Sequence, residues 1–466
     1  MTFAPQPAIY RPETPILSLG DSFYDAVAPA TFPQTRLRFR NDRWAETVGL
    51  DGLSDAQWIA HFGRFEPLPG NLEQPLALRY HGHQFRVYNP ELGDGRGFLF
   101  AQMRDGRDRL MDLGTKGSGQ TPWSRFGDGR LTLKGGMREI LATEMLEALG
   151  VETSKTFSLI ETGEALERGD EPSPTRSSVL VRLSHGHIRI GTFQRLAHLK
   201  DAEGMKRLVA YTLKHYFGTE AGEDAAAQLL AKVVEKTAVL APSFIGAGFV
   251  HGVLNTDNIN VSGESFDYGP WRFTPFYDPA FTAAYFDHQG LYAFGRQAEA
   301  VHWDVVQLAV ALRLIARAEE LVPALEHFAA YYEESLLAAL LRRLGVKSRG
   351  AVADKAMTGA LERALMENSV EIDRFFFDWR GGQLRSETAA ARYDSPAFDD
   401  LKGALASYGP AVRLDHDYWR DEAPCSMHID EVEAIWARID QADDWTALER
   451  KVAAIRRMGD AMGGGV

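Results

Sequence analysis

The sequence predicts an α+β fold with two lobes, in which a strand-rich lobe is followed by a larger helical lobe. Two observations carry this prediction. Between about residues 76 and 185, short apolar runs typical of strands are separated by glycine and aspartate. From about residue 190 onward, apolar residues recur at the three-to-four-residue spacing of helices. The cleft between two such lobes is the expected place for a ligand.

The composition indicates a folded protein and limits its partners. The chain has 466 residues, of which 45% are hydrophobic and 25% charged, and these values exclude a disordered or collagen-like chain. The formal net charge of −13 argues against nucleic acid or an anionic membrane as a partner. Cys425 is the single cysteine, so an intramolecular disulfide and any zinc site with two thiolates are excluded. We expect a cytoplasmic protein with no targeting signal and no membrane span, because the best apolar run, Val305 to Ala316, contains Gln307 and Arg313.

Four regions are expected along the chain. Residues 1–75 are rich in proline and lack periodicity, so they should form an N-terminal extension packed on the core. Residues 76–185 should form the strand-rich lobe and residues 186–395 the helical lobe. Residues 396–466 should form a C-terminal helical region.

Individual elements follow from the apolar spacing. In the first lobe we expect a twisted antiparallel sheet with strands at 97–103, 109–116, 155–160 and 178–183. One helix interrupts these strands, because apolar residues from Met137 to Leu149 have helical spacing and Gly150 ends the pattern. Further helices are predicted at 203–217, 223–241, 298–319, 322–345 and 427–457.

Two glycine-rich turns stand next to predicted elements of the first lobe. Gly93, Gly95 and Gly97 belong to the sequence Gly-Asp-Gly-Arg-Gly before a strand, and Gly-Asp-Gly-Arg recurs at 127–130 before the helix. Glycines at such places let backbone amides approach a phosphate closely. A tight turn is the more common reason for the same sequence, so the glycines alone do not indicate a nucleotide site.

Lys116, at the end of a predicted strand, and Glu139, in the following helix, are candidates for holding nucleotide phosphates. In protein kinases a helix glutamate fixes the flexible lysine ammonium group against the phosphates. Lys134 and Glu144 compete for the same roles, and spacing does not decide among them. A solvated surface pair is the alternative.

The most informative stretch runs from His251 to Asn258 (HGVLNTDN) and is followed by Asp267-Tyr268-Gly269. It is similar to a kinase catalytic loop followed by a metal-binding triplet. Val253 occupies the position of the catalytic aspartate and cannot accept a proton, so Asp257 is the nearest candidate base. Asn258 and Asp267 are candidate Mg²⁺ ligands, because a hard cation bound to phosphates and waters needs only one or two protein oxygens. An ordinary turn or helix cap is the alternative.

Arg182 and Arg189 flank the sequence Leu-Ser-His-Gly-His-Ile and could clamp a phosphate between two guanidinium groups. The alternative is that they are surface residues, because arginines on strands more often lay the aliphatic part of the side chain along the protein surface. Two pairs of histidines, His81 with His83 and His185 with His187, are each separated by one residue, a spacing that would place both rings of a pair on one face of a strand, as metal ligands can be. No third ligand is near either pair, so we expect structural, hydrogen-bonded roles for His81, His83, His185 and His187.

Taken together, these motifs resemble those of the selenoprotein O family, also called YdiU, of kinase-like protein adenylyltransferases. The resemblance covers roughly residues 75–290 and weakens beyond them. Its most specific stretches are YHGHQFRVYNPELGDGRG (80–97), DLGTKGSGQTPWSRFGDGR (112–130), REILATEMLEALGV (138–151), VRLSHGHIRIGTF (181–193) and HGVLNTDNI with SFDYGP. It implies a protein-kinase-like bilobal fold that binds ATP in a flipped orientation and transfers AMP to Ser, Thr or Tyr hydroxyls of proteins, with release of pyrophosphate.

The resemblance also implies a role for each matching residue. Asp257 is expected to accept the proton, Glu139 to orient Lys116, and Asn258 with Asp267 to bind Mg²⁺ or Mn²⁺. ATP is the expected co-substrate, and proteins, this chain among them, are the expected acceptors. Nucleotide contacts are expected at Gly93, Gly95, Arg96, Lys116, Asp128, Gly129, Arg182, Arg189 and Asp267. One departure is Lys134-Gly135-Gly136, which stands where relatives usually show an Arg-Ser-Ser-like run.

Three other functions stay open at this point. UTP in place of ATP would give UMP transfer. A true protein kinase would transfer the γ-phosphoryl group, and Val253 argues against it. A catalytically inactive, pseudokinase-like nucleotide-binding scaffold would need neither an acid nor paired metal ligands, so Asp257, Asn258 and Asp267 argue against it.

Overall fold

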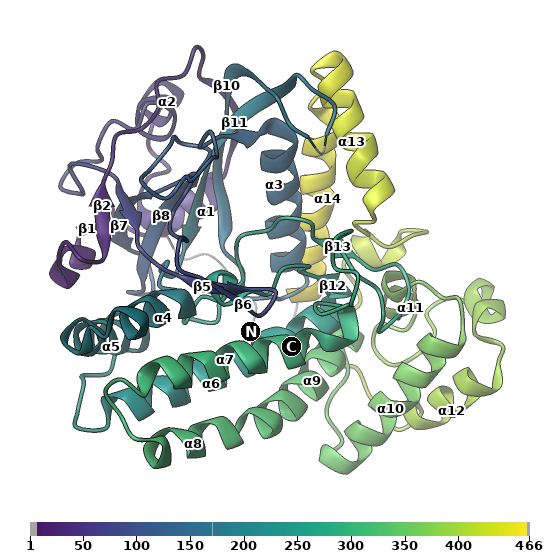
Figure 1. The fold of residues 1–466 in the computed structure, drawn as a ribbon. Helices are drawn as coiled ribbons and strands as arrows, with labels where there is room; N and C mark the ends of the chain where they lie inside the picture. The colour runs from purple at the N-terminus through teal and green to yellow at the C-terminus, as the bar shows by residue number, and fades with distance from the viewer. Residues whose placement is uncertain (1–6, 170, 464–466) are drawn as a thin grey trace.

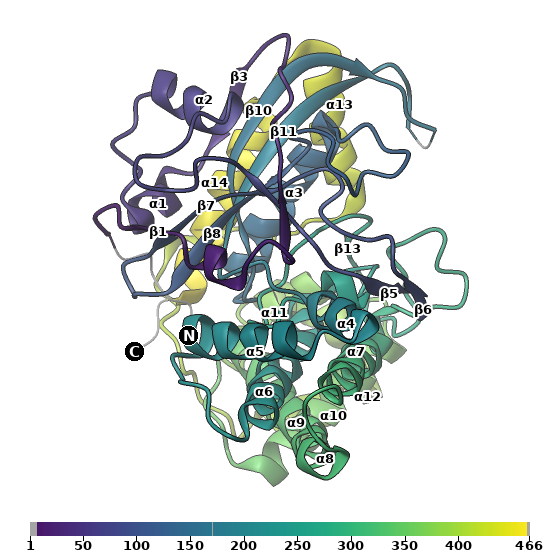
Figure 2. The same ribbon diagram turned by 60° about the vertical axis from the view of Figure 1, so that its left-hand side comes forward.

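The computed structural model describes residues 7–169 and 171–463, which form a strand-rich lobe and a helical lobe (Figures 1 and 2). The predicted two-lobe α+β architecture is confirmed. Within the described residues the first lobe contains a nine-stranded sheet whose main path runs β2-β4-β7-β8-β11-β10-β3, with β1 paired to β7 and β9 paired to β11. All of these pairs are antiparallel, as predicted.

The strands of the large sheet are β1 (Pro12–Glu13), β2 (Tyr24–Ala26), β3 (Arg36–Arg40), β4 (Leu76–Leu78), β7 (Leu99–Arg104), β8 (Leu110–Lys116), β9 (Leu131–Thr132), β10 (Lys155–Leu166) and β11 (Thr175–Ser184). Two short two-stranded sheets complete the set, one from β5 (Gly82–Gln84) with β6 (Val87–Asn89), the other from β12 (Phe249–Val250) with β13 (Arg272–Phe273).

The helices are α1 (Asp42–Ala45), α2 (Asp55–Gly63), α3 (Leu133–Ala148), α4 (Ile190–Leu199), α5 (Ala202–Phe217), α6 (Ala225–Ala247), α7 (Gln297–Leu312), α8 (Ala318–Glu326), α9 (Phe328–Leu344), α10 (Ala351–Glu367), α11 (Ile372–Asp378), α12 (Pro396–Leu405), α13 (Ile429–Ala442) and α14 (Thr446–Gly463).

The sheet is buried on both faces, which explains why its central strands carry apolar side chains on both sides. Along β11, Leu180 faces a core shared with α3, whereas Val179 and Val181 face a second core that contains Trp58 of α2. Successive side chains of a strand point to opposite faces, so both sets must be apolar. The four strands predicted from apolar runs are therefore found, as β7, β8, β10 and β11.

Helix α3 lies against one face of the sheet and carries Glu139. The Thr132 hydroxyl accepts a hydrogen bond from the Gly135 amide and so caps the N-terminus of the helix. Gly136 permits a close approach to β10, because a Cβ there would lie 2.3 Å from the Leu159 side chain. The glycines of Lys134-Gly135-Gly136 thus have a packing role in this chain.

The helical lobe differs from the prediction in its boundaries. The helix predicted at 298–319 is α7, which ends at Leu312, and the segment 322–345 is divided between α8 and α9. The single helix predicted at 427–457 is wrong, because Asp443 adopts φ +51 and divides it into α13 and α14. Helices α4, α10, α11 and α12 were not predicted individually, although they lie in regions predicted to be helical. No helix in the described ranges combines the length and apolarity needed to cross a bilayer.

The last two helices return to the first lobe. Figures 1 and 2 show α14 running beside α3, with α13 next to it. Arg456 of α14 donates to both carboxylate oxygens of Glu144 on α3, at 2.8 and 2.6 Å. The chain end thereby supports the helix that carries Glu139.

Candidate active site

A cleft of about 820 Å³ is lined by β8, β11, two glycine-containing loops and the segment around 253–269. All the predicted site residues except Glu139 line it, and Glu139 is bonded to Lys116, which does. We call the part formed by the buried side chains of Lys116, Arg182 and Arg189 its deep end. Its outer end is formed by Arg96 and by the loop 121–129, where the side chains are largely exposed.

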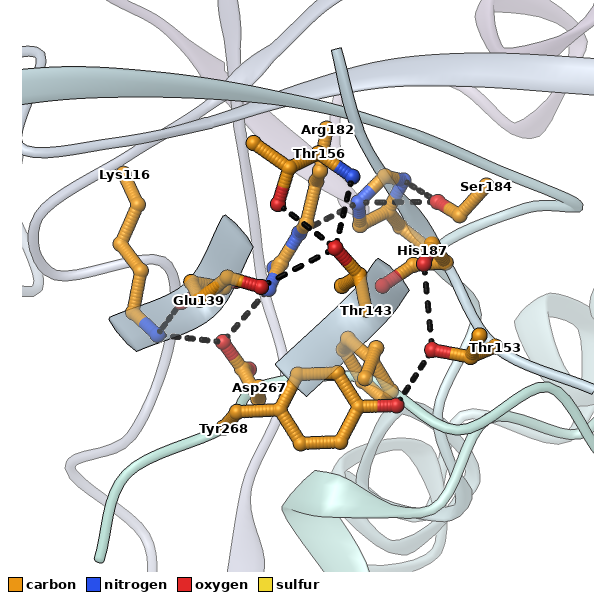
Figure 3. Close-up of polar contacts among 12 residues, drawn as sticks. Lys116, Glu139, Thr143, Thr153, Thr156, Arg182, Ser184, His187, Asp267 and Tyr268 are labelled. Atoms are coloured by element: carbon orange, nitrogen blue, oxygen red, sulfur yellow. Dashed lines mark hydrogen bonds and ion pairs between the residues drawn. The ribbon is translucent and has the colours of Figure 1, made fainter. Parts of the chain in front are cut away.

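Lys116 and Glu139 form the predicted pair at the deep end. Lys116 Nζ lies 2.7 Å from Glu139 Oε2 and 3.6 Å from Asp267 Oδ1 (Figure 3). Lys116 is the last residue of β8, and Glu139 lies in the second turn of α3. Both side chains are buried. The alternative of a solvated surface pair is therefore wrong.

The two arginines converge on the same carboxylate. Arg182 Nη1 donates to Asp267 Oδ1 at 2.6 Å, and Arg189 Nη1 donates to Asp267 Oδ2 at 3.2 Å. Their guanidinium groups lie 5.0 and 4.9 Å from the centre of the Phe266 ring. Arg189 also lies 4.2 Å from the ring centre of Tyr80. Neither arginine is a surface residue, so that alternative is wrong too.

Asp267 is the charge around which the deep end is organised. Burial alone would raise its pKa, but Arg182, Arg189 and Lys116 together hold that pKa well below its ordinary value. The carboxylate is therefore ionised at neutral pH. Its backbone has φ +62, a left-handed conformation that side-chain-bearing residues seldom adopt and that occurs preferentially at functional sites.

Asp257 and Asn258 lie in a 3₁₀ turn, Thr256–Asn258, at the cleft wall. Asp257 is buried, and burial raises its pKa to about 6; Arg189 opposes the increase and Asp267 adds to it. Its Oδ1 has no hydrogen-bond partner among the described residues. Asn258 donates through Nδ2 to the Val253 carbonyl at 2.9 Å. The turn predicted as the alternative is thus present, and it is this turn that fixes the two side chains.

The two glycine-containing loops pack against each other. A Cβ on Gly93 would lie 2.4 Å from the Trp123 ring, and a Cβ on Gly95 would lie 2.8 Å from the Trp123 carbonyl. Gly129 has φ +69, and a Cβ there would lie 2.3 Å from the Gly119 backbone. These glycines are required by close packing, and that packing brings both loops to the cleft.

Asp128 and Arg96 lie at the outer end, away from the buried charges. The Asp128 carboxylate is paired with Arg168 at 2.8 Å and is about half exposed, with a side-chain exposure of 48%. Arg96 is exposed. Any contact of these two residues with a ligand is therefore made near solvent.

Sequence reasoning missed Asp94, which belongs to the site. Its Oδ1 lies 3.3 Å from Arg189 Nη2, and its Oδ2 accepts a hydrogen bond from the Leu78 amide at 3.1 Å. Burial raises the pKa of Asp94, and Arg189 opposes that increase. Its place inside Gly-Asp-Gly-Arg-Gly was a usable signal. The aromatic supports Tyr80 and Phe266 gave no such signal, because isolated aromatic residues are usually core residues.

The four predicted histidines all make hydrogen bonds. His81 bonds to Tyr88, His83 to Gln194, and His185 to the Leu110 carbonyl. His187 lies behind Arg182, with its Nε2 3.2 Å from Arg182 Nε. It is thus a support for one of the cleft arginines.

Comparison with known proteins assigns the family. The family model described as "Protein adenylyltransferase SelO" matches residues 9–397. The chain belongs to the SelO family. The match extends well beyond the region 75–290 on which the motifs lie, in both directions along the chain. Members of this family are nucleotidyltransferases, and the chain is accordingly an enzyme of that class.

Several relatives match over most of the chain. A protein nucleotidyltransferase YdiU from Synechococcus elongatus is 41% identical over 97% of this chain and 96% of its own. The one from Gloeobacter violaceus is 42% identical over 96% and 95%. The one from a Synechocystis species is 48% identical over 72% and 71%. A Toxoplasma gondii rhoptry antigen kinase domain covers 57% of this chain and 78% of its own, at 14% identity and a TM-score of 0.28. The kinase-like arrangement rests instead on the two lobes and on the Lys116–Glu139 pair, which joins β8 to α3 within the first lobe.

Proposed function

We propose that this protein transfers AMP from ATP to Ser, Thr or Tyr hydroxyl groups of proteins and releases pyrophosphate. The observation that carries the proposal is the separation of charges in the cleft. Three buried cations surround Asp267 at the deep end, while Asp257 stands beside them as a second carboxylate with a raised pKa. The relatives named above carry the name protein nucleotidyltransferase, which supports proteins as acceptors.

Charge supports a triphosphate at the deep end. Lys116, Arg182 and Arg189 are buried, and buried charges act through a lower effective dielectric constant than exposed ones. Asp267 balances them and orients both guanidinium groups. Phosphoryl and nucleotidyl transfer depend mainly on such positioning and charge stabilisation, so the cations would contribute most of the rate acceleration.

Asp257 is the proton acceptor in this proposal. The acceptor hydroxyl oxygen forms a bond to the α-phosphorus, and the bond from that phosphorus to the oxygen bridging to the β-phosphorus breaks. Pyrophosphate leaves, and the hydroxyl proton passes to Asp257. A pKa of about 6 keeps Asp257 largely ionised at neutral pH while making it a better base than an ordinary aspartate. Val253 cannot take this role.

Asn258 and Asp267 fit a divalent cation by the chemistry of their donors. Both line the cleft and offer an amide oxygen and a carboxylate oxygen, which are ligands that Mg²⁺ and Mn²⁺ accept. When bound, such a cation would neutralise phosphate charge as a Lewis acid. Among the described residues no three His, Cys, Asp or Glu side chains form a metal-binding group. We therefore expect the cation to bind together with the nucleotide, whose phosphates supply further ligands.

The test is to incubate the protein with Mg²⁺ and ATP labelled at either the α- or the γ-phosphate, with and without added proteins. Covalent α-label without γ-label, with a mass gain of one AMP, is the expected result. Covalent γ-label alone would indicate a kinase, and nucleotide binding without any label would indicate a scaffold. The same assay with UTP decides between AMP and UMP transfer.

Two variants test the assigned roles. Asp257→Ala should reduce transfer by about 10²–10⁴-fold, as expected for loss of a general base. Asp267→Ala should reduce it at least as much, because it removes the charge that orients Arg182 and Arg189 and one of the two candidate metal ligands. Full activity of Asp267→Ala would contradict the metal assignment.

A further inference from the structure

Phe126 is an exposed aromatic residue at the outer end of the nucleotide cleft. It lies in the loop 121–129 between β8 and β9, it lines the cleft, and its side chain is fully exposed. Exposing a phenylalanine ring to water is unfavourable, by roughly 1.5–3 kcal/mol relative to complete burial. The ring therefore needs an explanation that the charged residues of the cleft do not provide.

The loop that carries Phe126 is held firmly against the first glycine loop. The Thr121 hydroxyl donates to the Asp94 carbonyl at 2.5 Å, and the Ser124 hydroxyl donates to the Gly95 carbonyl. Trp123 Nε1 donates to Asp25 at 2.9 Å. Residues 124–127 form a tight turn, closed by a 2.7 Å hydrogen bond from the Gly127 amide to the Ser124 carbonyl. Phe126 stands at this turn, so its exposure is imposed by an anchored backbone.

Cations line both ends of the cleft, but only those at the deep end are buried, and this difference decides which end of a nucleotide reaches Phe126. The buried cations Lys116, Arg182 and Arg189 all lie at the deep end and would hold the phosphates there. Figure 3 shows Lys116 and Arg182 directed at Asp267. The nucleoside must then extend toward the outer end, because the deep end is filled by charged groups and their aromatic supports.

Phe126 is the lining aromatic residue best placed to receive a base. Tyr80 is already covered by the Arg189 guanidinium group, whose carbon lies 4.2 Å from its ring centre. Trp123 packs against the backbone at Gly93, where a Cβ would lie 2.4 Å from its ring. The ring of Phe126 is fully exposed, so both its faces are accessible. An aromatic face stacks well on a nucleobase whatever the base.

We infer that Phe126 is the stacking platform for the nucleobase, and that it sets how strongly the base contributes to nucleotide affinity. This inference rests on the proposed function, because it assumes that the deep end binds the triphosphate. The inference makes two predictions that do not follow from the charges of the cleft. Inorganic tripolyphosphate should bind without contacting Phe126, and the higher affinity for ATP than for tripolyphosphate should come from this ring.

The experiment is calorimetric titration of the full-length protein with ATP and with inorganic tripolyphosphate, each in the presence of Mg²⁺. Phe126→Ala should raise the Kd for ATP roughly ten-fold or more, which is within the range for loss of one base–aromatic stack. The Kd for tripolyphosphate should stay within about two-fold of wild type, since no phosphate contact is lost. Unchanged tripolyphosphate binding also shows that the cleft of the variant is intact.

Three further variants separate stacking from other effects. Phe126→Trp retains an aromatic face and should preserve ATP binding, whereas Phe126→Leu retains apolar bulk without that face and should weaken it. Tyr285→Ala is the matched control, because Tyr285 is an exposed aromatic residue, 79% accessible, that does not line the cleft. It should change neither Kd.

Three results would overturn the inference. They are an unchanged ATP Kd in Phe126→Ala, an equal loss of ATP and tripolyphosphate affinity, and full retention of ATP binding by Phe126→Leu. These results are distinct from failure of the proposed function. If Phe126→Ala selectively loses ATP affinity but no AMP is transferred, the base platform is supported and adenylyl transfer is not. If AMP is transferred and Phe126→Ala binds ATP normally, adenylyl transfer is supported and the base platform is not.

Discussion

Helix α3 presents two buried glutamates to two different parts of the molecule. Glu139 bonds to Lys116 in the cleft, at 2.7 Å. Glu144, five residues later in the sequence, bonds to Arg456 of α14 at 2.6 Å. Each is almost completely inaccessible to solvent, with a side-chain exposure of 1% for Glu139 and 3% for Glu144. Two chemically identical residues on one helix thus have one partner in the candidate site and one in the C-terminal region.

Lys116 and Lys134, the two candidates for the phosphate-binding lysine, also have partners in these two different parts of the molecule. Lys116 lies within 3.6 Å of Asp267 at the deep end of the cleft. Lys134 pairs instead with Glu433 of α13 at 2.7 Å, and this pair is partly exposed. The comparison teaches that a charge belongs to the site when several buried charges converge on it. A charge with one partner on a neighbouring helix fastens two elements together.

The largest effect is expected on the cleft side of α3. Glu139→Gln keeps the size of the side chain but removes the charge that holds the Lys116 ammonium group. We expect kcat for label transfer to fall by about 10²-fold, which is typical when one positioned charge interaction in an active site is lost. The KM for ATP should change less, because Arg182 and Arg189, the other two proposed phosphate-binding cations, remain in place.

Glu144→Gln is the matched control for Glu139→Gln. It makes the same chemical change on the side of α3 that faces α14, and it should leave kcat within about two-fold of wild type. Equal losses of kcat in the two variants would show that any charge change in α3 disables the enzyme. The assignment of Glu139 as the residue that positions Lys116 would then fail.

The next largest effect is expected on the free energy of unfolding, at the contact between α3 and α14. Glu144→Ala leaves Arg456 and Arg43 without their shared acceptor. Removing one partner of a buried pair costs about 3–5 kcal/mol, but both arginines are one-third exposed and can be solvated, so we expect a loss of about 2–3 kcal/mol in the free energy of unfolding. Urea unfolding measures it. A loss below about 0.5 kcal/mol, the range of ordinary surface substitutions, would show that α14 does not stabilise α3 through this contact.

The sequence predicted the parts of the fold that depend on local pattern. Strands β7, β8, β10 and β11 were predictable because both faces of the sheet are buried and the apolar runs are long. The division between α13 and α14 was not predictable, because the apolar spacing continues through it. It depends on the left-handed backbone of a single residue, Asp443.

In the candidate site the limit was of another kind. The choice of Asp257 over Val253 follows from chemistry, since only a carboxylate can accept the proton. The burial of Arg182 and Arg189 cannot be deduced from the sequence in this way. It depends on contacts with Tyr80, Phe266 and Asp267, which are distant from both arginines in the sequence. Choosing Lys116 over Lys134 likewise needed the partner on α13.

A smaller effect is expected at the end of α13, and it depends on pH. Asp443 pairs with Arg38 of β3 and Arg176 of β11. Burial opposes these pairs, but hydrogen bonds from Arg176, Trp445 and Arg38 lower the pKa of Asp443 to about 2 from a usual 3.8. A lowered folded-state pKa stabilises the folded protein above the unfolded-state pKa, and this contribution is lost as pH falls through the folded-state value.

Asp443→Asn tests this contribution while retaining a residue that tolerates the left-handed backbone. The variant should have a lower urea midpoint than wild type at pH 7 and at pH 5. The difference should shrink as the pH falls from about 4 toward 2, because the wild-type carboxylate then becomes protonated. A difference that stays constant down to pH 3 would indicate that the amide disturbs packing and that the charge pairs contribute little.

The smallest effect is expected at Lys134, and it decides the choice between the two lysines. The Lys134–Glu433 pair has side-chain exposures of 22% and 45%, and pairs this exposed contribute less than about 1 kcal/mol. Lys134→Ala should therefore change the free energy of unfolding by less than about 1 kcal/mol and leave kcat within about two-fold of wild type. Lys116→Ala, the same truncation on the cleft side, should abolish most of the activity because it removes one of the three buried cations. A strong loss of activity in Lys134→Ala, with unfolding unchanged, would mean that Lys134 leaves Glu433 to contact the nucleotide during the reaction, and the outer side of α3 would then share in catalysis.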